Sequence, residues 1–278
     1  MNHFPDQTQL FTDSFEFCSL GSGSSGNSYY IGNGNKGFLI DAGINGQHLK
    51  RTLQGIGIQI ENIQAVFITH DHIDHVRALN ALTRLYRIPV YANEGTWRGI
   101  LNNRFTGNID YACHEQLSSN QTISIAGFLV RTFPVSHDAS DPVGYQIVKD
   151  NKSLVIATDL GFIGSEIADF LRKSSAWILE SNYDYEMLIN GRYSKELKNR
   201  ILSETGHMDN VHTARFIAEN YSENLSHILL CHLSKENNTP ELALNEVEKA
   251  FQERNISMAK STRLLALPRT RHSEVFTL

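Results

Sequence analysis

Short apolar runs, rich in β-branched and aromatic residues, recur along the chain and alternate with longer amphipathic stretches. The apolar runs are typical of strands inside a sheet, whereas the amphipathic stretches repeat with the period of a helix. Helices are predicted over residues 46–57, 74–87, 164–173, 195–204, 211–223 and 239–254. In the last of these, Thr239 can cap the helix and Pro240 fits its first position. The alternation predicts an α/β protein (α+β in some schemes).

Several of the apolar runs end on a histidine or a carboxylate. The residues at these ends are Asp41, His70, His137, Asp159, Glu180 and His232. In α/β folds, loops at the carboxyl ends of strands assemble sites from segments that are distant in sequence. The pattern therefore predicts one site at the edge of a sheet, built from residues spread over most of the chain.

Composition limits the class of protein. With 278 residues, of which 41% are hydrophobic, the chain can bury a large core. We expect one domain over residues 1–278, with residues 1–13 as a flexible N-terminal extension. The N-terminal residues have neither a basic start nor an apolar stretch, and no apolar run reaches membrane-spanning length. We therefore expect neither a signal peptide nor a membrane span.

The cysteines and the net charge indicate the expected compartment and binding partners. Cys18, Cys113 and Cys231 are odd in number and far apart, which argues against a disulfide framework and favours a reducing cytoplasm. The formal net charge of -5 provides no general attraction for nucleic acid. Binding of nucleic acid would therefore need a local basic patch.

The glycine-rich stretch GSGSSGNS, residues 21–28, matches two phosphate-binding patterns by spacing alone. Gly21, Gly23 and Gly26 fit the dinucleotide-binding pattern, and Gly26 also fits a P-loop in which Asn27 replaces the lysine. Both patterns require a helix to begin at the loop. The residues that follow instead predict a β-hairpin. A Gly/Ser turn is therefore favoured over a nucleotide cofactor.

The densest group of candidate ligands is THDHIDHVRAL, residues 69–79. Alternation along an extended segment puts His70 and His72 on one side, while Asp74 and His75 can turn to the other side as a helix begins. One loop can therefore serve two metal ions, and imidazole with carboxylate suits zinc, manganese or iron. The alternative is a loop of solvated histidines in which Asp74 caps the helix.

This stretch resembles the H-x-H-x-D-H signature of the metallo-β-lactamase fold hydrolases, and the resemblance extends over residues 15–235. Further segments resemble the WalJ/YycJ-type branch, which is regarded as 5′-to-3′ DNA exonucleases. These segments are GSGSSGNS, ESNYD at 180–184, RILSETGHMDN at 200–210 and HLSKENNTPE at 232–241. One departure is Tyr183, which stands where the branch usually has histidine.

The resemblance implies a four-layer αβ/βα sandwich with a site for two divalent transition-metal ions (Zn, Mn or Fe). By this resemblance, His70, His72 and His137 bind one ion, whereas Asp74, His75 and His232 bind the other. Asp159 bridges the two ions. A hydroxide between two such ions can attack phosphorus in line. Taken singly, Asp159 can also be read as a helix cap, and the histidines as buried core residues.

Other residues are candidates for supporting roles. His207 can donate a proton to the leaving oxygen, or be an exposed residue that precedes a helix beginning at Asp209 or Asn210. Asp41 is expected to orient the ligand loop by hydrogen bonding rather than to bind metal. Glu180 can be such a partner or a surface charge. The candidate substrate-binding residues are Ser24, Asn27, Ser234, Asn237 and Asn238, of which the last three can alternatively fix His232 or form an ordinary turn.

The predicted function is that of a cytoplasmic, metal-dependent phosphodiester hydrolase, a 5′-to-3′ DNA exonuclease, with Asp74 and His207 as catalytic residues. RNA or a small phosphodiester are alternative substrates. The alternatives in class are a hydrolase of cyclic phosphodiesters, thioesters or lactones, and a non-catalytic metal-binding protein. An acidic nuclease should gather its cations near the site. Candidates for this phosphate track are Arg77, Arg84, Arg87, Lys198, Arg200 and Lys235.

Overall fold

The structure is a computed structural model that describes residues 14–34, 36–118 and 121–278. The expected N-terminal extension, residues 1–13, lies outside the described residues. Within the described part of the chain, no helix is long and apolar enough to cross a membrane.

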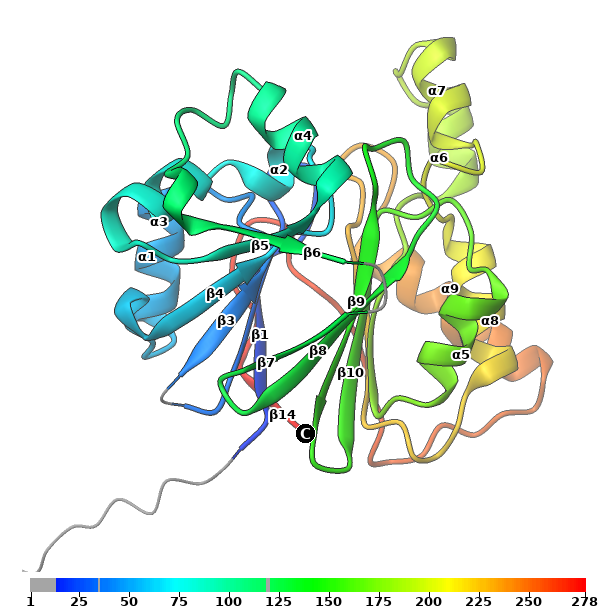
Figure 1. The fold of residues 1–278 in the computed structure, drawn as a ribbon. Coiled ribbons are helices and arrows are strands. Elements are labelled where there is room, and N and C mark those ends of the chain that lie inside the picture. Colours follow the sequence, from blue (N-terminus) through cyan, green and yellow to red (C-terminus); the bar gives the residue numbers. More distant parts are fainter. Residues whose placement is uncertain (1–13, 35, 119–120) are drawn as a thin grey trace, which may run out of the picture.

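Two seven-stranded sheets face each other (Figure 1). The first sheet has the order β14 (Phe276–Thr277), β1 (Glu16–Gly21), β2 (Ser28–Gly32), β3 (Gly37–Ile40), β4 (Ile63–Phe67), β5 (Val90–Asn93) and β6 (His114–Leu117). The second has the order β13 (Arg263–Ala266), β12 (His227–Cys231), β11 (Ala176–Glu180), β10 (Lys152–Ala157), β9 (Val143–Lys149), β8 (Phe128–Pro134) and β7 (Thr122–Ile125). The strands β3 to β6 run parallel, as do β10 to β13.

Helices cover the outer face of each sheet (Figure 1). The first sheet is covered by α1 (Gly46–Gly55), α2 (Ile73–Val76), α3 (Leu79–Tyr86) and α4 (Glu94–Asn102). The second is covered by α5 (Ser165–Arg172), α8 (Asn210–Asn220) and α9 (Pro240–Glu253). Two short helices, α6 (Tyr185–Asn190) and α7 (Lys195–Ile201), project beyond the second sheet.

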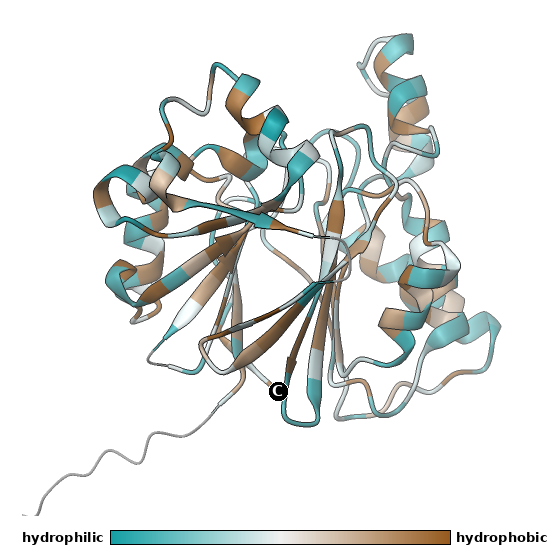
Figure 2. Cartoon of the chain, in the orientation of Figure 1, coloured by the Kyte–Doolittle hydropathy of each residue, from teal (hydrophilic) through white to brown (hydrophobic). Residues whose placement is uncertain are grey.

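The central strands are buried on both faces. In β10, Leu154 and Ile156 pack between the sheets, whereas Val155 and Ala157 pack toward the helices. In β3, Phe38 likewise faces the other sheet. Figure 2 shows hydrophobic residues along both sheets. Burial of both faces explains why these strands are continuous apolar runs in the sequence. The four layers confirm the predicted αβ/βα sandwich.

The helix predicted over residues 74–87 is interrupted, because its backbone groups are used by neighbouring segments. The Asp74 carbonyl accepts the Asn27 N–H at 2.7 Å, and the Ala78 N–H donates to the Ala42 carbonyl at 2.8 Å. The helical bond between residues 78 and 74 is thereby replaced, and α2 and α3 form instead. The hairpin predicted after the glycine-rich stretch is confirmed as the antiparallel pair β2 and β3.

The sequence did not predict α4, since two glycines weaken its helical pattern. Both glycines are explained by close packing. A Cβ at Gly95 would lie 2.0 Å from the Ser140 carbonyl oxygen, and one at Gly99 would lie 1.9 Å from an oxygen of Asp71. Close approach to these loops, rather than helix propensity, decides the residue type here.

Candidate metal centre

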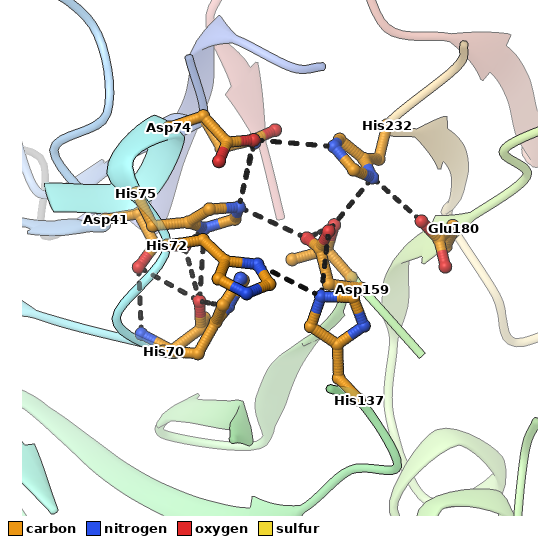
Figure 3. A network of polar contacts seen from close by, with 12 residues as sticks. Asp41, His70, His72, Asp74, His75, His137, Asp159, Glu180 and His232 are labelled. Carbon is orange, nitrogen blue, oxygen red and sulfur yellow. Dashed lines mark hydrogen bonds and ion pairs between the residues drawn. The ribbon is translucent and has the colours of Figure 1, made fainter. Parts of the chain in front are cut away.

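The predicted ligands come together at one edge of the two sheets, where several strands end (Figure 3). Asp41 directly follows β3, Asp159 lies two residues after β10, and His232 directly follows β12. All three have left-handed backbone conformations, with φ of 60°, 55° and 53°. Residues other than glycine seldom adopt this conformation, and such backbone strain clusters at functional sites.

Ligand atoms of these residues form overlapping groups whose members lie within 4.8 Å of one another. The groups are His70, His72 and His137; Asp74, His75 and His232; His70, His75 and Asp159; and Asp159, Glu180, His207 and His232. The first two groups contain the same residues as the two ligand sets that the resemblance implies. Asp159 lies between them, with its oxygens 3.3 Å from His75 Nε2, 3.1 Å from His232 Nδ1 and 3.9 Å from His137 Nε2.

The alternative interpretations of these residues, as solvated loop histidines and as helix caps, do not match the structure. His70 and His75 are buried rather than solvated, and His72, not Asp74, occupies the N-cap position of α2. The N-cap of α5 is Gly164, so Asp159 does not cap that helix either.

The donor set fits a divalent metal. Nε2 of His70 and Nε2 of His232 are buried and have no hydrogen-bond partner among the described residues. Buried polar atoms normally have a partner, so each of these two nitrogens is suited to coordinate a cation. Imidazole nitrogen combined with carboxylate oxygen is typical of transition-metal sites. Divalent metal binding is therefore indicated by the cluster itself.

The electrostatics of the cluster favour the metal-binding protonation state at Asp159 and at His70. At His75 and His232, by contrast, burial opposes protonation but the adjacent carboxylates outweigh it and raise the pKa of both rings, so these two must lose a proton to coordinate a metal. Burial opposes ionisation of Asp159, but the positive charge of His232 and His75 outweighs it and holds the pKa of Asp159 well below its usual range. Burial, together with the charge of His75, lowers the pKa of His70 well below its usual range. A carboxylate and a neutral imidazole are the forms that coordinate a metal.

Asp41 orients the ligand loop. Its carboxylate accepts the Thr69 N–H at 2.8 Å and the Thr69 hydroxyl at 2.9 Å. It also lies 2.7 Å from Nδ1 of His75, which leaves Nε2 of that ring facing Asp74 and Asp159. This geometry is the one that the expected orienting role of Asp41 requires.

Glu180 holds the opposite side of the cluster. It is completely buried, and its Oε1 lies 2.8 Å from Nδ1 of both His207 and His232. Burial alone would raise its pKa, but the adjacent His207 and His232 lower the pKa of Glu180 to about 2. Of the two interpretations left open by the sequence, the structure excludes a surface charge. The sequence did not reveal Asn182, whose side-chain N–H donates to the His232 carbonyl at 2.7 Å.

The predicted substrate-binding residues fall into two sets. Ser24 and Ser234 line a pocket of about 390 Å³ in front of the cluster. Asn237 and Asn238, by contrast, are buried and do not line this pocket, which corrects their expected contact with substrate. The Asn238 side chain donates to the carbonyls of residues 181 and 182, and thereby holds the segment that carries Asn182.

Asn27 and the glycine-rich stretch support the ligand loop instead of exposing a phosphate cradle. The Asn27 amide nitrogen lies 3.0 Å from Nε2 of His75 and 3.3 Å from an oxygen of Asp74. Its backbone carbonyl accepts the Gly43 N–H at 2.8 Å. A Cβ at Gly43 would lie 1.5 Å from the Asp74 carbonyl oxygen, so only glycine permits this backbone packing. We therefore correct the expected substrate contact of Asn27 to a contact with candidate ligands.

Among the six candidate cations of the phosphate track, only Arg200 lines the pocket. Its guanidinium pairs with Asp138, which itself lies 3.5 Å from Nε2 of His137. Lys198 donates to the carbonyls of Ile189 and Gly191 at 2.7 and 2.8 Å, where it holds the end of α6. The six cations therefore do not form a continuous track of free charges.

The chain also resembles known proteins in sequence and in fold. The chain matches the family described as beta-lactamase superfamily domain over residues 36–228. It therefore belongs to the metallo-β-lactamase fold superfamily, and is a metal-dependent hydrolase of that fold.

The relatives are more specific. Exodeoxyribonuclease WalJ of Streptococcus pneumoniae is 37% identical over 229 residues, which cover 82% of this chain and 85% of WalJ. Exodeoxyribonuclease YycJ of Bacillus anthracis is 35% identical over 245 residues, which cover 88% of this chain and 92% of YycJ. The crystal structure of the metallo-β-lactamase fold protein YhfI from Bacillus subtilis has a TM-score of 0.69 at 14% identity, and the match covers 96% of this chain and 100% of that one. The predicted resemblance to the WalJ/YycJ-type branch is confirmed.

Proposed function

We propose that the protein is a cytoplasmic 5′-to-3′ DNA exonuclease that hydrolyses phosphodiesters with two divalent transition-metal ions. The observation that carries this proposal is the pair of three-residue ligand groups on either side of Asp159. The similarity to two exodeoxyribonucleases over more than four fifths of the chain supports DNA as the substrate.

The residues would divide between two ions as the sequence predicted. His70, His72 and His137 would hold one ion, and Asp74, His75 and His232 the other, with Asp159 contacting both. Bound divalent ions supply positive charge to phosphoryl oxygens and make water more acidic. A closed structural site needs four protein ligands and is often rich in cysteine. The seven ligands and the open pocket therefore favour catalysis over a structural role.

The protein's own groups then act on the substrate and its protons. Glu180 fixes Nδ1 of His207, so that Nε2 of this ring is the atom that can give a proton to the leaving oxygen. Asp74 lines the pocket, and interaction with His75 and His232 lowers its pKa although burial opposes this. Its carboxylate therefore stays ionised, available for metal and for orienting the attacking water. Arg200, Ser24 and Ser234 are placed to contact phosphate oxygens.

A small-substrate hydrolase is the second candidate. It is favoured by the scarcity of free cations around the pocket, because a cyclic phosphodiester, a thioester or a lactone needs no extended phosphate track. RNA is the corresponding alternative among polymers.

The deciding experiment compares substrates with one metal-reconstituted preparation. A 5′-labelled DNA strand should release a labelled mononucleotide at once, whereas a 3′-labelled strand should shorten progressively. RNA of the same sequence and bis-p-nitrophenyl phosphate are the alternative substrates. Asp159→Ala should abolish activity, while Asp169→Ala, a carboxylate with 61% side-chain exposure on α5, should not change it. Faster turnover of the small diester than of either polymer would overturn the proposal.

A further inference from the structure

A second pocket, of about 320 Å³, lies beside the metal centre and is mainly apolar. Its lining residues include Phe162, Leu202, His207, Met208, Asp209 and His212. The lining comes from the loop after β10, the loop between β11 and α6, the segment between α7 and α8, and α8 itself. Apart from His207, the proposed hydrolysis uses none of these residues.

His207 forms a wall between the two pockets, since it lines both. Its ring centroid lies 5.1 Å from that of His137 and 5.2 Å from that of His232. The apolar pocket therefore begins one imidazole away from the candidate ligands. The chain also links the two sites directly, because Phe162 follows Asp159 by three residues.

The second pocket has the character of a site for a flat, partly polar ring. Phe162 is 47% exposed and Leu202 is 37% exposed, although both are large apolar residues. Met208, also part of the lining, is buried. One polar pair borders the pocket, where Nδ1 of His212 lies 2.5 Å from Asp209. Pockets of this size, with apolar walls and a few polar groups, typically bind small organic ligands.

We propose that this pocket holds the base of a nucleotide next to the scissile phosphate, with Phe162 as the stacking surface. A nucleotide offers an anionic phosphate and a flat base on one flexible backbone, and the two pockets offer a cationic centre and an aromatic wall on either side of His207. Proteins that bind single-stranded nucleic acid without sequence preference use such aromatic platforms.

Base stacking also compensates for the weak phosphate track. The chain has a net charge of -5, and Arg200 and Lys198 are engaged within the protein. Affinity for a strand must then come in part from contacts that do not depend on charge. The inference rests on the proposed nuclease activity, since it concerns the same substrate.

The test combines a change in the protein with a matched change in the substrate. Phe162→Ala should raise KM for single-stranded DNA by roughly 5- to 100-fold, the range expected for the loss of one stacked base. Phe162→Trp keeps an aromatic face and should remain within about threefold of wild type. Phe105→Ala, which removes a phenylalanine of 66% exposure that lines neither pocket, is the control and should leave KM unchanged.

The matched substrates carry an abasic residue at the terminal or at the adjacent position. Wild type should bind one of these two strands more weakly than it binds normal DNA. The affinity of Phe162→Ala for that strand should equal the affinity of wild type for it. The abasic position that weakens binding identifies which base the pocket holds. Equal KM of wild type and Phe162→Ala on normal DNA would overturn the inference. So would loss of the discrimination between normal and abasic DNA in a Tyr193→Ala variant, because Tyr193 lines the other pocket. Failure of wild type to cleave any DNA would instead overturn the proposed function.

Discussion

The two halves of the candidate metal centre are built in different ways. On the side of the first sheet, four ligands come from one loop of six residues, His70 to His75, and Asp41 and Asn27 hold that loop from beneath. On the side of the second sheet, His137, Asp159 and His232 come from three separate loops. There one oxygen of Glu180 contacts both His207 and His232, and its other oxygen accepts the Leu160 N–H at 3.0 Å. The first half is local in sequence, whereas the second exists only when the second sheet has formed.

The largest expected effect is on turnover and comes from the local half. Asp74→Ala should lower kcat by more than about 10³-fold, because it removes a proposed ligand that also lines the pocket. The Asp74 side chain is mostly buried, but its pairs with His75 and His232 are long, at 3.7 and 3.9 Å, so the free energy of unfolding should fall by only about 1 kcal/mol. Single-turnover kinetics and denaturant unfolding of the metal-free protein measure the two quantities. Parallel losses of activity and stability would contradict the account.

His75→Ala should behave differently from its neighbour, because it leaves the completely buried Asp41 without its partner 2.7 Å away. Breaking a buried pair in this way costs about 3 kcal/mol, so His75→Ala should destabilise the metal-free protein much more than Asp74→Ala does. Asp41→Asn combined with His75→Ala should recover part of this loss. Additive effects of the two substitutions in a double-mutant cycle would show that the pair is not coupled.

Substitution of Asp41 or Glu180, which contact the proposed ligands, should have a smaller effect than substitution of a ligand itself. Asp41→Asn and Glu180→Gln should each weaken metal binding by about 10- to 100-fold, measured by competition with a chelator. Both substitutions should mainly affect the ion assigned to Asp74, His75 and His232, because Asp41 contacts His75 and Glu180 contacts His232. Glu180→Gln should also lower kcat through His207. If Glu180→Gln changes neither quantity, the assignment of Glu180 as the partner of both histidines is wrong.

The smallest effect is expected from the surface charge next to the pocket. Arg200→Ala should raise KM for oligonucleotides a few-fold and reduce the salt dependence of log KM by roughly 0.7 to 0.9, the value for one phosphate contact. Lys235→Ala is the comparison, because this lysine is 77% exposed and pairs with Glu236 outside the pocket. An equal change in salt dependence for both variants would show that the DNA strand does not specifically contact Arg200.

The same difference between the halves decides how much the sequence could predict. The four ligands of the loop are visible at once, and His137, Asp159 and His232 are visible because each follows an apolar strand. The bond between Glu180 and His207 and the contact of Asn182 with His232 depend on how two loops meet, which no local pattern records. Likewise, Asn237 and Asn238 look like solvated turn residues in the sequence, but they are buried because the loop before α9 folds against residues 181 and 182.

Metal titration of wild type and Asp159→Ala tests the central claim most directly, namely that the Asp159 carboxylate serves both ion sites. Wild type should bind two divalent ions per chain, measured by elemental analysis after equilibrium dialysis. Asp159→Ala should weaken both sites together, whereas His72→Ala should weaken only the site shared with His70 and His137. Loss of a single ion in Asp159→Ala, with the second bound as tightly as in wild type, would contradict the account.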